Sequence, residues 1–184
     1  MYTGKLIRLR AYKKEDLPLA QVWLNDPEMK TNLAPGIPYP YTLEDEEKWY
    51  LGNTSSSNDV YTFAIEDLAT GSYIGGCGIN WVDWKNSRAM VGIAIGNKDF
   101  LGKGYGTDAM EVLVAFIFNQ MNIRKIKLMV YAFNERAMKS YKKCGFVVEG
   151  IKKQEVFKNG AYHDEIEMAL FRDDWAARRK QATE

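Results

Sequence analysis

The sequence predicts one α/β domain on a mixed, mostly antiparallel sheet of six to seven strands with about four helices. Three observations lead to this prediction. A strand pattern at residues 88–95 is followed by clustered glycines, a helix pattern and a second strand pattern at residues 125–131. Such a βαβ unit is parallel and right-handed. Turn signals at residues 67–71 and at Asn159-Gly160 each join two alternating segments, which predicts antiparallel hairpins.

The N-terminal part of the chain begins with a strand at residues 6–10. A helix follows over residues 15–24, with two acids in its first turn, at the positive end of the helix dipole. Residues 27–41 are rich in proline and glycine, so we expect a long loop there without regular structure. Loops of this length often carry specificity.

A second helix is expected over residues 42–51, with Thr42 as its N-cap. Residues 44–47 are all acidic. We interpret them as a solvated helix start that satisfies the dipole, and the alternative is a patch that attracts a polyamine. The polar residues 53–59 predict a turn.

Three alternating segments then predict an antiparallel meander, at residues 61–66, 73–80 and 88–95. The turn before the third strand, residues 81–86, contains Trp81 and Trp84. Two interpretations stay open for these tryptophans, namely a substrate contact or packing over a sheet edge.

The C-terminal half alternates helices with strands. Helices are expected over residues 107–121 and 134–144, the second closed by Gly145, and strands over residues 125–131, 146–157 and 162–170. Beyond residue 171 the chain is polar and only Trp175 looks anchored, so we expect a single domain over residues 1–175 and a polar tail over residues 176–184.

Composition excludes several classes of function. The chain has 184 residues, a net charge of +1 with interspersed signs, 46% apolar and 27% charged residues. These values suit an ordinary globular protein and favour neither a nucleic-acid nor a membrane partner, and we expect a cytoplasmic location. Cys77 and Cys144 are interpreted as small buried hydrophobes, and one histidine gives no zinc spacing, so no metal site is expected.

The glycine cluster predicts an anion-binding turn between strand and helix. Gly102, Gly104 and Gly106 lack a β-carbon that could block a ligand, and the first amides of a helix lack intrahelical partners. A P-loop does not fit, because Gly104 stands where a hydroxyl should bind Mg²⁺. A dinucleotide-binding fingerprint does not fit, because Thr107 stands in place of the third small residue. The alternative is a helix-capping loop without a ligand.

A second motif follows in the helix over residues 134–144. Asn134 and Tyr141 are seven residues apart, so both lie on one helix face. Taken alone, an asparagine is a common N-cap and a helical tyrosine is usually a core residue. The order of a phosphate-binding turn, a strand and then this helix makes a functional pair more plausible.

Together these motifs give the chain a family resemblance. Leu101-Gly-Lys-Gly-Tyr-Gly106, Asn134-x-x-Ala-x-x-x-Tyr141-x-x-x-Gly-Phe146 and the hairpin Phe157-x-Asn-Gly160-x-Tyr162 resemble the GNAT superfamily of acyl-CoA-dependent N-acyltransferases. Within it, the chain is most similar to the branch of ribosomal-protein N-terminal and spermidine acetyltransferases. There are two departures: Leu101 replaces the usual glutamine or arginine of the loop, and Met90 replaces a carboxylate that several relatives carry.

The resemblance implies a V-shaped cleft between two splayed parallel strands that end near Ile95 and Val130. Acetyl-CoA would be the co-substrate, with its pantetheine along the backbone of Ile93 and Ile95 and also held by Asn134. Its pyrophosphate would rest on the amides of Gly102, Lys103, Gly104, Tyr105, Gly106 and Thr107. A free amine would attack the thioester directly, in a ternary complex, and Tyr141 would protonate the departing thiolate.

The acceptor and the general base stay open at this level. The acceptor would be either a protein N-terminus or a small amine such as a polyamine. Glu66, Asp83, Asp164 and His163 are the candidates for the base, with bulk water as an alternative. The departures at Leu101 and Met90 also allow a non-catalytic CoA-binding sensor domain. Aromatic surface strands suggest a possible homodimer.

Overall fold

The computed structural model describes residues 2–33, 36–53 and 59–181. It contains a seven-stranded sheet in the order β1-β2-β3-β4-β5-β7-β6. The strands are β1 Ile7–Arg10, β2 Tyr61–Asp67, β3 Tyr73–Asp83, β4 Arg88–Ile95, β5 Lys125–Tyr131, β6 Val147–Lys158 and β7 Ala161–Phe171. The helices are α1 Leu17–Leu24, α2 Pro27–Leu33, α3 Leu43–Asn53, α4 Tyr105–Gln120, α5 Glu135–Cys144 and α6 Arg172–Gln181. The predicted α/β class and the strand count are confirmed.

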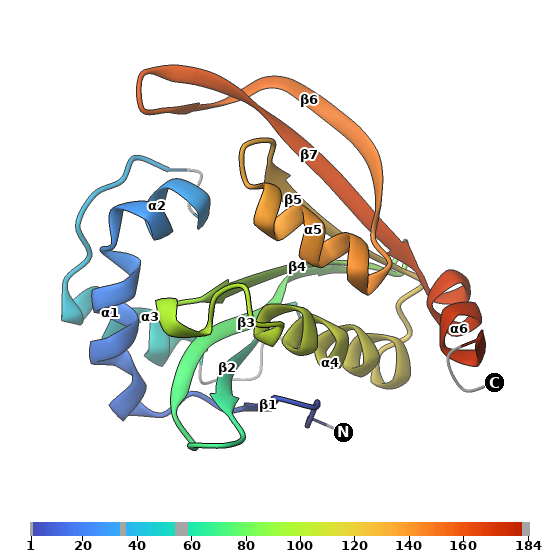
Figure 1. The fold of residues 1–184 in the computed structure, drawn as a ribbon, viewed down its shortest axis with the longest axis horizontal. Helices are drawn as coiled ribbons and strands as arrows, with labels where there is room; N and C mark the ends of the chain where they lie inside the picture. The colour runs from blue at the N-terminus through green and yellow to red at the C-terminus, as the bar shows by residue number, and fades with distance from the viewer. Residues whose placement is uncertain (1, 34–35, 54–58, 182–184) are drawn as a thin grey trace.

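The strands pair antiparallel except for β4 and β5, which are parallel. Figure 1 shows α4 along one face of the sheet, α1 and α3 at one end of the molecule, and the long β6–β7 hairpin arching above α5 towards α2. The turn of this hairpin has positive φ at Asn159 (49°) and Gly160 (80°), as the Asn-Gly signal predicts.

The hydrophobic core lies between α4 and the sheet. Met110, Leu113 and Ile117 of α4 are fully buried, and they belong to one cluster with apolar residues of β3, β4 and β5. The broad apolar stripe of α4 therefore faces the sheet, as its spacing predicts. Cys77 and Cys144 are buried free thiols, which agrees with their interpretation as small hydrophobes.

The parallel pair separates soon after it begins. Only three residue pairs match across it, Arg88↔Lys125, Ala89↔Ile126 and Met90↔Lys127. Beyond Met90, β4 keeps its pairing with β3 on one side, and its other edge has no paired strand within the described residues. The splayed pair that the resemblance implies is confirmed, and it opens a cleft between the two strands.

The expectation of a long irregular loop over residues 27–41 is wrong in its first part, where α2 forms. Proline fits the first position of a helix because its missing N–H has no intrahelical acceptor there. Asp26 caps the helix, since its Oδ1 accepts hydrogen bonds from the amides of Glu28 at 3.0 Å and Met29 at 3.1 Å. The remaining proline and glycine residues follow the helix, and residues 36–42 are irregular.

The polar tail is helical over most of its length, which the sequence analysis does not predict. Trp175 of α6 packs against Phe118 of α4 with ring centroids 5.3 Å apart, as expected for an anchor. The helix continues to Gln181, across the expected boundary at residue 175. Of the predicted turn at residues 53–59, positions 54–58 lie outside the described residues. Within the described ranges, no helix is both long enough and apolar enough to span a bilayer.

Candidate active site

The glycine turn after β4 takes a conformation that only glycine adopts readily. Gly102 has φ of 73° and Gly104, the N-cap of α4, has φ of 94°. The helix starts at Tyr105, two residues earlier than expected. The amide of Asp108 donates to the Gly104 carbonyl at 2.9 Å, so the amides of residues 105–107 have no acceptor within the helix. These amides form a positive dipole end that can bind an anion.

A cavity of about 820 Å³ occupies the space between the splayed strands and the glycine turn. Its volume is typical of small-molecule sites. Eight of the residues that the resemblance implicates line it, namely Ile93, Ile95, Gly102, Gly104, Gly106, Thr107, Asn134 and Tyr141. The two departures from the family pattern, Met90 and Leu101, line it as well.

Lys103 and Tyr105 are not among the described residues that line this cavity. Lys103 is exposed. The ring of Tyr105 packs edge-to-face on Phe100, with centroids 4.8 Å apart. The side chain of Tyr105 is therefore packed within the protein, whereas that of Lys103 lies at the surface.

Asn134 caps α5 and faces the cavity. Its side-chain Oδ1 accepts a hydrogen bond from the amide of Ala137 at 3.1 Å, while its own backbone amide donates to the carbonyl of Tyr131 at 2.8 Å. The cap leaves the side-chain NH₂ of Asn134 as a donor towards the cavity. A ligand carbonyl there would find a hydrogen-bond donor in a fixed position.

Tyr141 lies two turns further along the same helix and is 9% exposed. Burial raises the pKa of its phenol to about 12, with a smaller contribution from Cys144. Its ring lies edge-on to Phe146, with centroids 6.2 Å apart. A phenol in this setting stays protonated at neutral pH, so it can serve as a proton donor to a group in the cavity.

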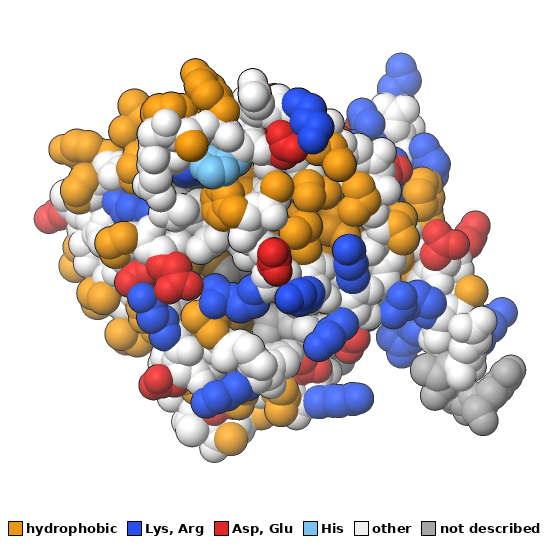
Figure 2. Space-filling view, turned by 45° about the horizontal axis from the view of Figure 1, so that its top comes forward, with side chains coloured by type: hydrophobic (Ala, Val, Ile, Leu, Met, Phe, Trp, Pro, Cys, Tyr) orange, Lys and Arg blue, Asp and Glu red, His pale blue; other side chains and the backbone are white. Residues whose placement is uncertain are grey.

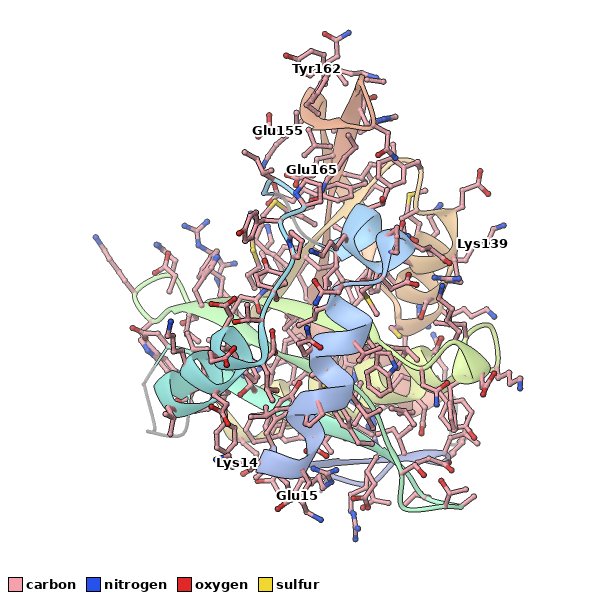
Figure 3. The ribbon with its side chains drawn as sticks, turned by 90° about the vertical axis from the view of Figure 1, so that its left-hand side faces the viewer. Lys14, Glu15, Lys139, Glu155, Tyr162 and Glu165 are labelled. Carbon is pink, nitrogen blue, oxygen red and sulfur yellow. The ribbon has the colours of Figure 1, made fainter. Side chains whose placement is uncertain are left out.

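Cationic side chains line one side of the cavity. Figure 2 shows Lys and Arg side chains spread across the middle of the face that is turned towards the viewer. The cationic residues that line the cavity are Arg136, Lys139 and Lys143, all on α5. In Figure 3, Lys139 points away from the body of the molecule. These side chains favour an anionic ligand that enters from this side.

The carboxylates considered as a general base form hydrogen bonds and ion pairs with other residues of the protein. Burial disfavours the ionised form of Glu66, but hydrogen bonds from Arg8 and Arg10 outweigh it and lower the pKa of Glu66. Hydrogen bonds from Asn86, together with Arg88, lower the pKa of Asp83 to about 2.

The other two candidates lie on β7. The pKa of Asp164 is lowered by Lys153, which lies 2.8 Å away, and by the amide of Gln154. His163 packs edge-to-face against Phe133, with centroids 4.9 Å apart. None of these four residues is among the described residues that line this cavity or the second one beside it.

A second cavity, of about 590 Å³, adjoins the first. Its walls come from α1, α2 and α3 and from β2, β3 and β4, and it includes Glu46. Glu165 of β7 lines the first cavity and binds Lys152 at 2.9 Å. The sequence analysis does not single out Glu165. For Glu46 the sequence does contain a hint that the side chain faces inward. Trp49 lies three residues further along the helix, so its aromatic ring lies on the same helix face as Glu46.

Trp81 lies within β3 and not in the expected turn, and Trp84 lies in the turn after β3. Neither tryptophan is among the described residues that line either cavity. The indole N–H of Trp84 donates to Asp59 at 3.0 Å, and the guanidinium of Arg88 lies 5.9 Å from the Trp81 ring. This geometry favours packing at the sheet edge over a substrate contact.

Comparison with known proteins gives one family and several relatives. Residues 7–147 match the family model described as an acetyltransferase (GNAT) domain. Spermidine N(1)-acetyltransferase of Escherichia coli is 37% identical over 93 residues, which is 50% of each chain. A spermidine N-acetyltransferase from Vibrio cholerae, solved in complex with CoA and spermine, has a TM-score of 0.84 at 25% identity, covering 94% of this chain and 99% of that one.

A ribosomal-protein alpha-N-acetyltransferase, solved in complex with coenzyme A, has a TM-score of 0.81 and covers 93% of this chain and 97% of its own. At 21% identity, this similarity concerns the fold. The matches fall in the same branch that the sequence motifs indicate.

Proposed function

This chain belongs to the GNAT acetyltransferase family, and on that premise we propose that it transfers an acetyl group from acetyl-CoA to a primary amine by direct attack in a ternary complex. One observation carries the proposal. The separation of β4 from β5 leaves an open strand edge in a cavity that also contains the glycine turn and Tyr141. An extended amide-bearing chain can pair with such an edge as an added strand.

The residues on the cavity wall fit the donor. The amides of residues 105–107 would receive the pyrophosphate at the N-terminus of α4. The backbone of Ile93 and Ile95 and the amide group of Asn134 would hold the pantetheine, and the cations on α5 would attract the phosphates. Leu101 supplies no hydrogen-bond donor, so the phosphate site relies on backbone amides.

In the proposed reaction, the neutral amine nitrogen forms a bond to the thioester carbonyl carbon. A backbone amide of β4 stabilises the negative charge that develops on the carbonyl oxygen. As the carbon–sulfur bond breaks, Tyr141 gives its proton to the sulfur. The proton released by the amine passes to a base or to water, and Tyr141 regains a proton from solvent.

Two acceptor classes are compatible with this site. The relatives that act on spermidine support a small polyamine, and the ribosomal-protein acetyltransferase supports a protein N-terminus through its fold alone. The second cavity, beside β4 and opposite β5, is the region where either acceptor would approach the thioester.

The proposal is tested by free-thiol release from acetyl-CoA with spermidine, spermine, aminoglycosides, amino acids and peptides with alanine or serine N-termini. We expect turnover with one of these classes. Acetyl-CoA binding in calorimetry without turnover of any acceptor would favour a non-catalytic sensor domain. Absence of acetyl-CoA binding would contradict the donor site itself.

We also propose that the chain forms a homodimer through β6. This strand is an edge of the sheet and carries exposed apolar side chains, including Val147 (57%), Ile151 (52%) and Phe157 (60%). Figure 3 shows Tyr162 at the far end of the same hairpin, beyond Glu165. A second copy could pair with this edge across a two-fold axis. Light scattering after size exclusion should give twice the mass of one chain. The Ile151→Lys variant places a charge on this edge, so it should have the mass of a single chain. A monomeric wild type at micromolar concentration would contradict the proposal.

A further inference from the structure

The pairing of β3 with β4 contains one irregularity, and it lies where β4 separates from β5. Ile79 of β3 pairs with Val91. The next pair joins Trp81 to Met90, so Asn80 has no partner in the described ladder. Two residues of β3 thus oppose one residue of β4, which is the arrangement of a β-bulge. Bulges occur beside active sites, where they turn a side chain in a new direction.

This bulge decides which side chains of β3 face the cavities. Ile79 is fully buried, and Val82 packs against the same core cluster. In a regular strand two positions three residues apart lie on opposite faces. The extra residue therefore keeps both apolar side chains on the core face and leaves Asn80 exposed on the other face.

Asn80 lies where the two cavities meet. Six described residues line both cavities, namely Met29, Leu33, Asn80, Gly92, Ile93 and Ala94. Asn80 is the one among these six whose side chain carries a strong hydrogen-bond donor and acceptor. This side chain forms no hydrogen bond within the described ranges, so both groups are available to a ligand.

The amide of Asn80 lies directly over the backbone of β4. A β-carbon at Gly92 would lie 3.1 Å from Nδ2 of Asn80 and 3.6 Å from Oδ1. The absence of a side chain at Gly92 therefore leaves the space beside this amide open. The thioester is proposed to lie along the same strand, next to Ile93. Figure 3 looks onto α1, α2 and α3, which supply further walls of the second cavity, from which the acceptor would approach.

An attacking amine needs a hydrogen-bond acceptor at this point. When the nitrogen lone pair points at the thioester carbon, the N–H groups point away from it, and a positioned acceptor fixes that orientation. Met90 offers only an apolar side chain where several relatives of the family carry a carboxylate. The Oδ1 of Asn80 is a neutral acceptor on the adjacent strand.

We propose that Asn80 contacts the attacking nitrogen, because its Oδ1 accepts a hydrogen bond from the amine and directs the lone pair to the thioester carbon. The inference rests on the proposed acetyl transfer at β4. An amide takes no proton near neutral pH, so Asn80 orients the nucleophile and is not a general base. The amine must then lose its extra proton to another group or to water before it attacks.

The kinetic test uses spermidine and a peptide with an alanine N-terminus as acceptors. Asn80→Ala should lower kcat by about 10- to 100-fold through loss of orientation, while KM for acetyl-CoA changes by less than about twofold. Asn119→Ala, at the exposed end of α4, is the matched control and should behave as the wild type. Full activity of Asn80→Ala with an acceptor that the wild type acetylates would overturn the proposal.

The pH dependence separates a contact with the nitrogen from a structural role. In Asn80→Asp, a carboxylate at the same position would bind the ammonium form of the acceptor, take its proton and later pass that proton to solvent. The logarithm of kcat/KM should therefore rise less steeply with pH in Asn80→Asp than in the wild type, which needs the neutral amine. Asn119→Asp, which adds the same charge elsewhere, should keep the wild-type profile. Identical profiles for Asn80→Asp and the wild type would overturn the contact.

A second readout does not depend on turnover. In nuclear magnetic resonance spectra of isotope-labelled protein, the side-chain amide signals of Asn80 are identified by their absence from Asn80→Asp. Spermidine or the alanine peptide, added in the presence of coenzyme A, should shift these signals but not those of Asn119.

This measurement keeps the two proposals apart. A shift without acetylation would support the contact even though the proposed reaction fails. Acetylation without a shift would overturn the contact and leave the acetyltransferase function intact. A protein that shows neither with both acceptors would contradict the contact as well as the reaction with these amines.

Discussion

The hydroxyl of Thr107, in the first turn of α4, lies 2.8 Å from the hydroxyl of Ser140 in α5. The thiol of Cys144 lies 3.6 Å from the carbonyl of Thr107 and reinforces the same contact. The helix that presents the proposed phosphate site is thereby joined to the helix that carries Asn134 and Tyr141. Both halves of the donor site keep one relative position because of this contact.

The first prediction concerns this link. Thr107→Val and Ser140→Ala should each weaken acetyl-CoA binding by about two- to tenfold, the effect of one hydrogen bond. Because the two hydroxyls bond to each other, the double variant should lose little more than either single one. Calorimetry of acetyl-CoA binding measures this, with Ser72→Ala in the β2–β3 turn as a control. Additive losses would mean that each hydroxyl acts alone.

The second prediction concerns Tyr141. Tyr141→Phe removes the proposed proton donor and keeps the ring, so turnover should fall by roughly one to three orders of magnitude while acetyl-CoA affinity changes little. Steady-state kinetics together with calorimetry separate the two quantities. Tyr162→Phe, on the exposed hairpin, is the matched control. Full activity of Tyr141→Phe would remove its role as the acid.

The third prediction concerns the glycine turn. Gly104 sits at φ of 94° as the N-cap of α4, so Gly104→Ala should cost about 1–2 kcal/mol of stability and weaken acetyl-CoA binding. Gly150→Ala is the control, because an added methyl group there meets no atom within 4 Å and its φ is not positive. Thermal denaturation and calorimetry check both effects. Equal behaviour of the two variants would contradict the requirement for a left-handed residue.

The sequence predicts those features that rest on local chemistry. The N-cap Asn134, the stop at Gly145, the Asn-Gly hairpin and the glycine turn each follow from the backbone preferences of a few residues. The α2 helix is missed because the nearby prolines outweigh the capping signal of Asp26 in a composition-based analysis.

Two features could not be predicted from local sequence. They are the inward direction of the Glu46 side chain and the hydrogen bonds that Glu66 accepts from Arg8 and Arg10. Both depend on residues far apart in the chain that the fold brings together, such as Tyr73 beside α3 and Arg8 beside β2. Local periodicity cannot show which of four adjacent acids turns into a cavity. The packing of α3 against the rest of the fold determines which side chain faces inward.

The fourth prediction uses two buried carboxylates whose pKa values are shifted in opposite directions. Burial, and to a smaller extent the charge of Asp45, raises the pKa of Glu46 above its ordinary value of 4.5. At neutral pH the ionised group therefore costs folding free energy, and Glu46→Gln should raise the Tm by about 2–4 °C. The gain should shrink as the pH falls through the raised pKa and vanish below about pH 4.5, where the carboxyl is protonated in both folded and unfolded states.

Glu66 gives the contrast with the opposite sign. Its pKa is lowered because the hydrogen bonds from Arg8 and Arg10 outweigh burial, so its ionised form stabilises the folded state at neutral pH. Glu66→Gln should cost about 1–3 kcal/mol there, and the deficit should disappear as the pH falls from about 4.5 through the lowered pKa. Thermal denaturation of both variants between pH 3 and pH 8 checks the pair. A Glu46→Gln variant that is less stable than the wild type at neutral pH would show that the carboxylate has a favourable partner in the folded protein, and it would contradict this prediction.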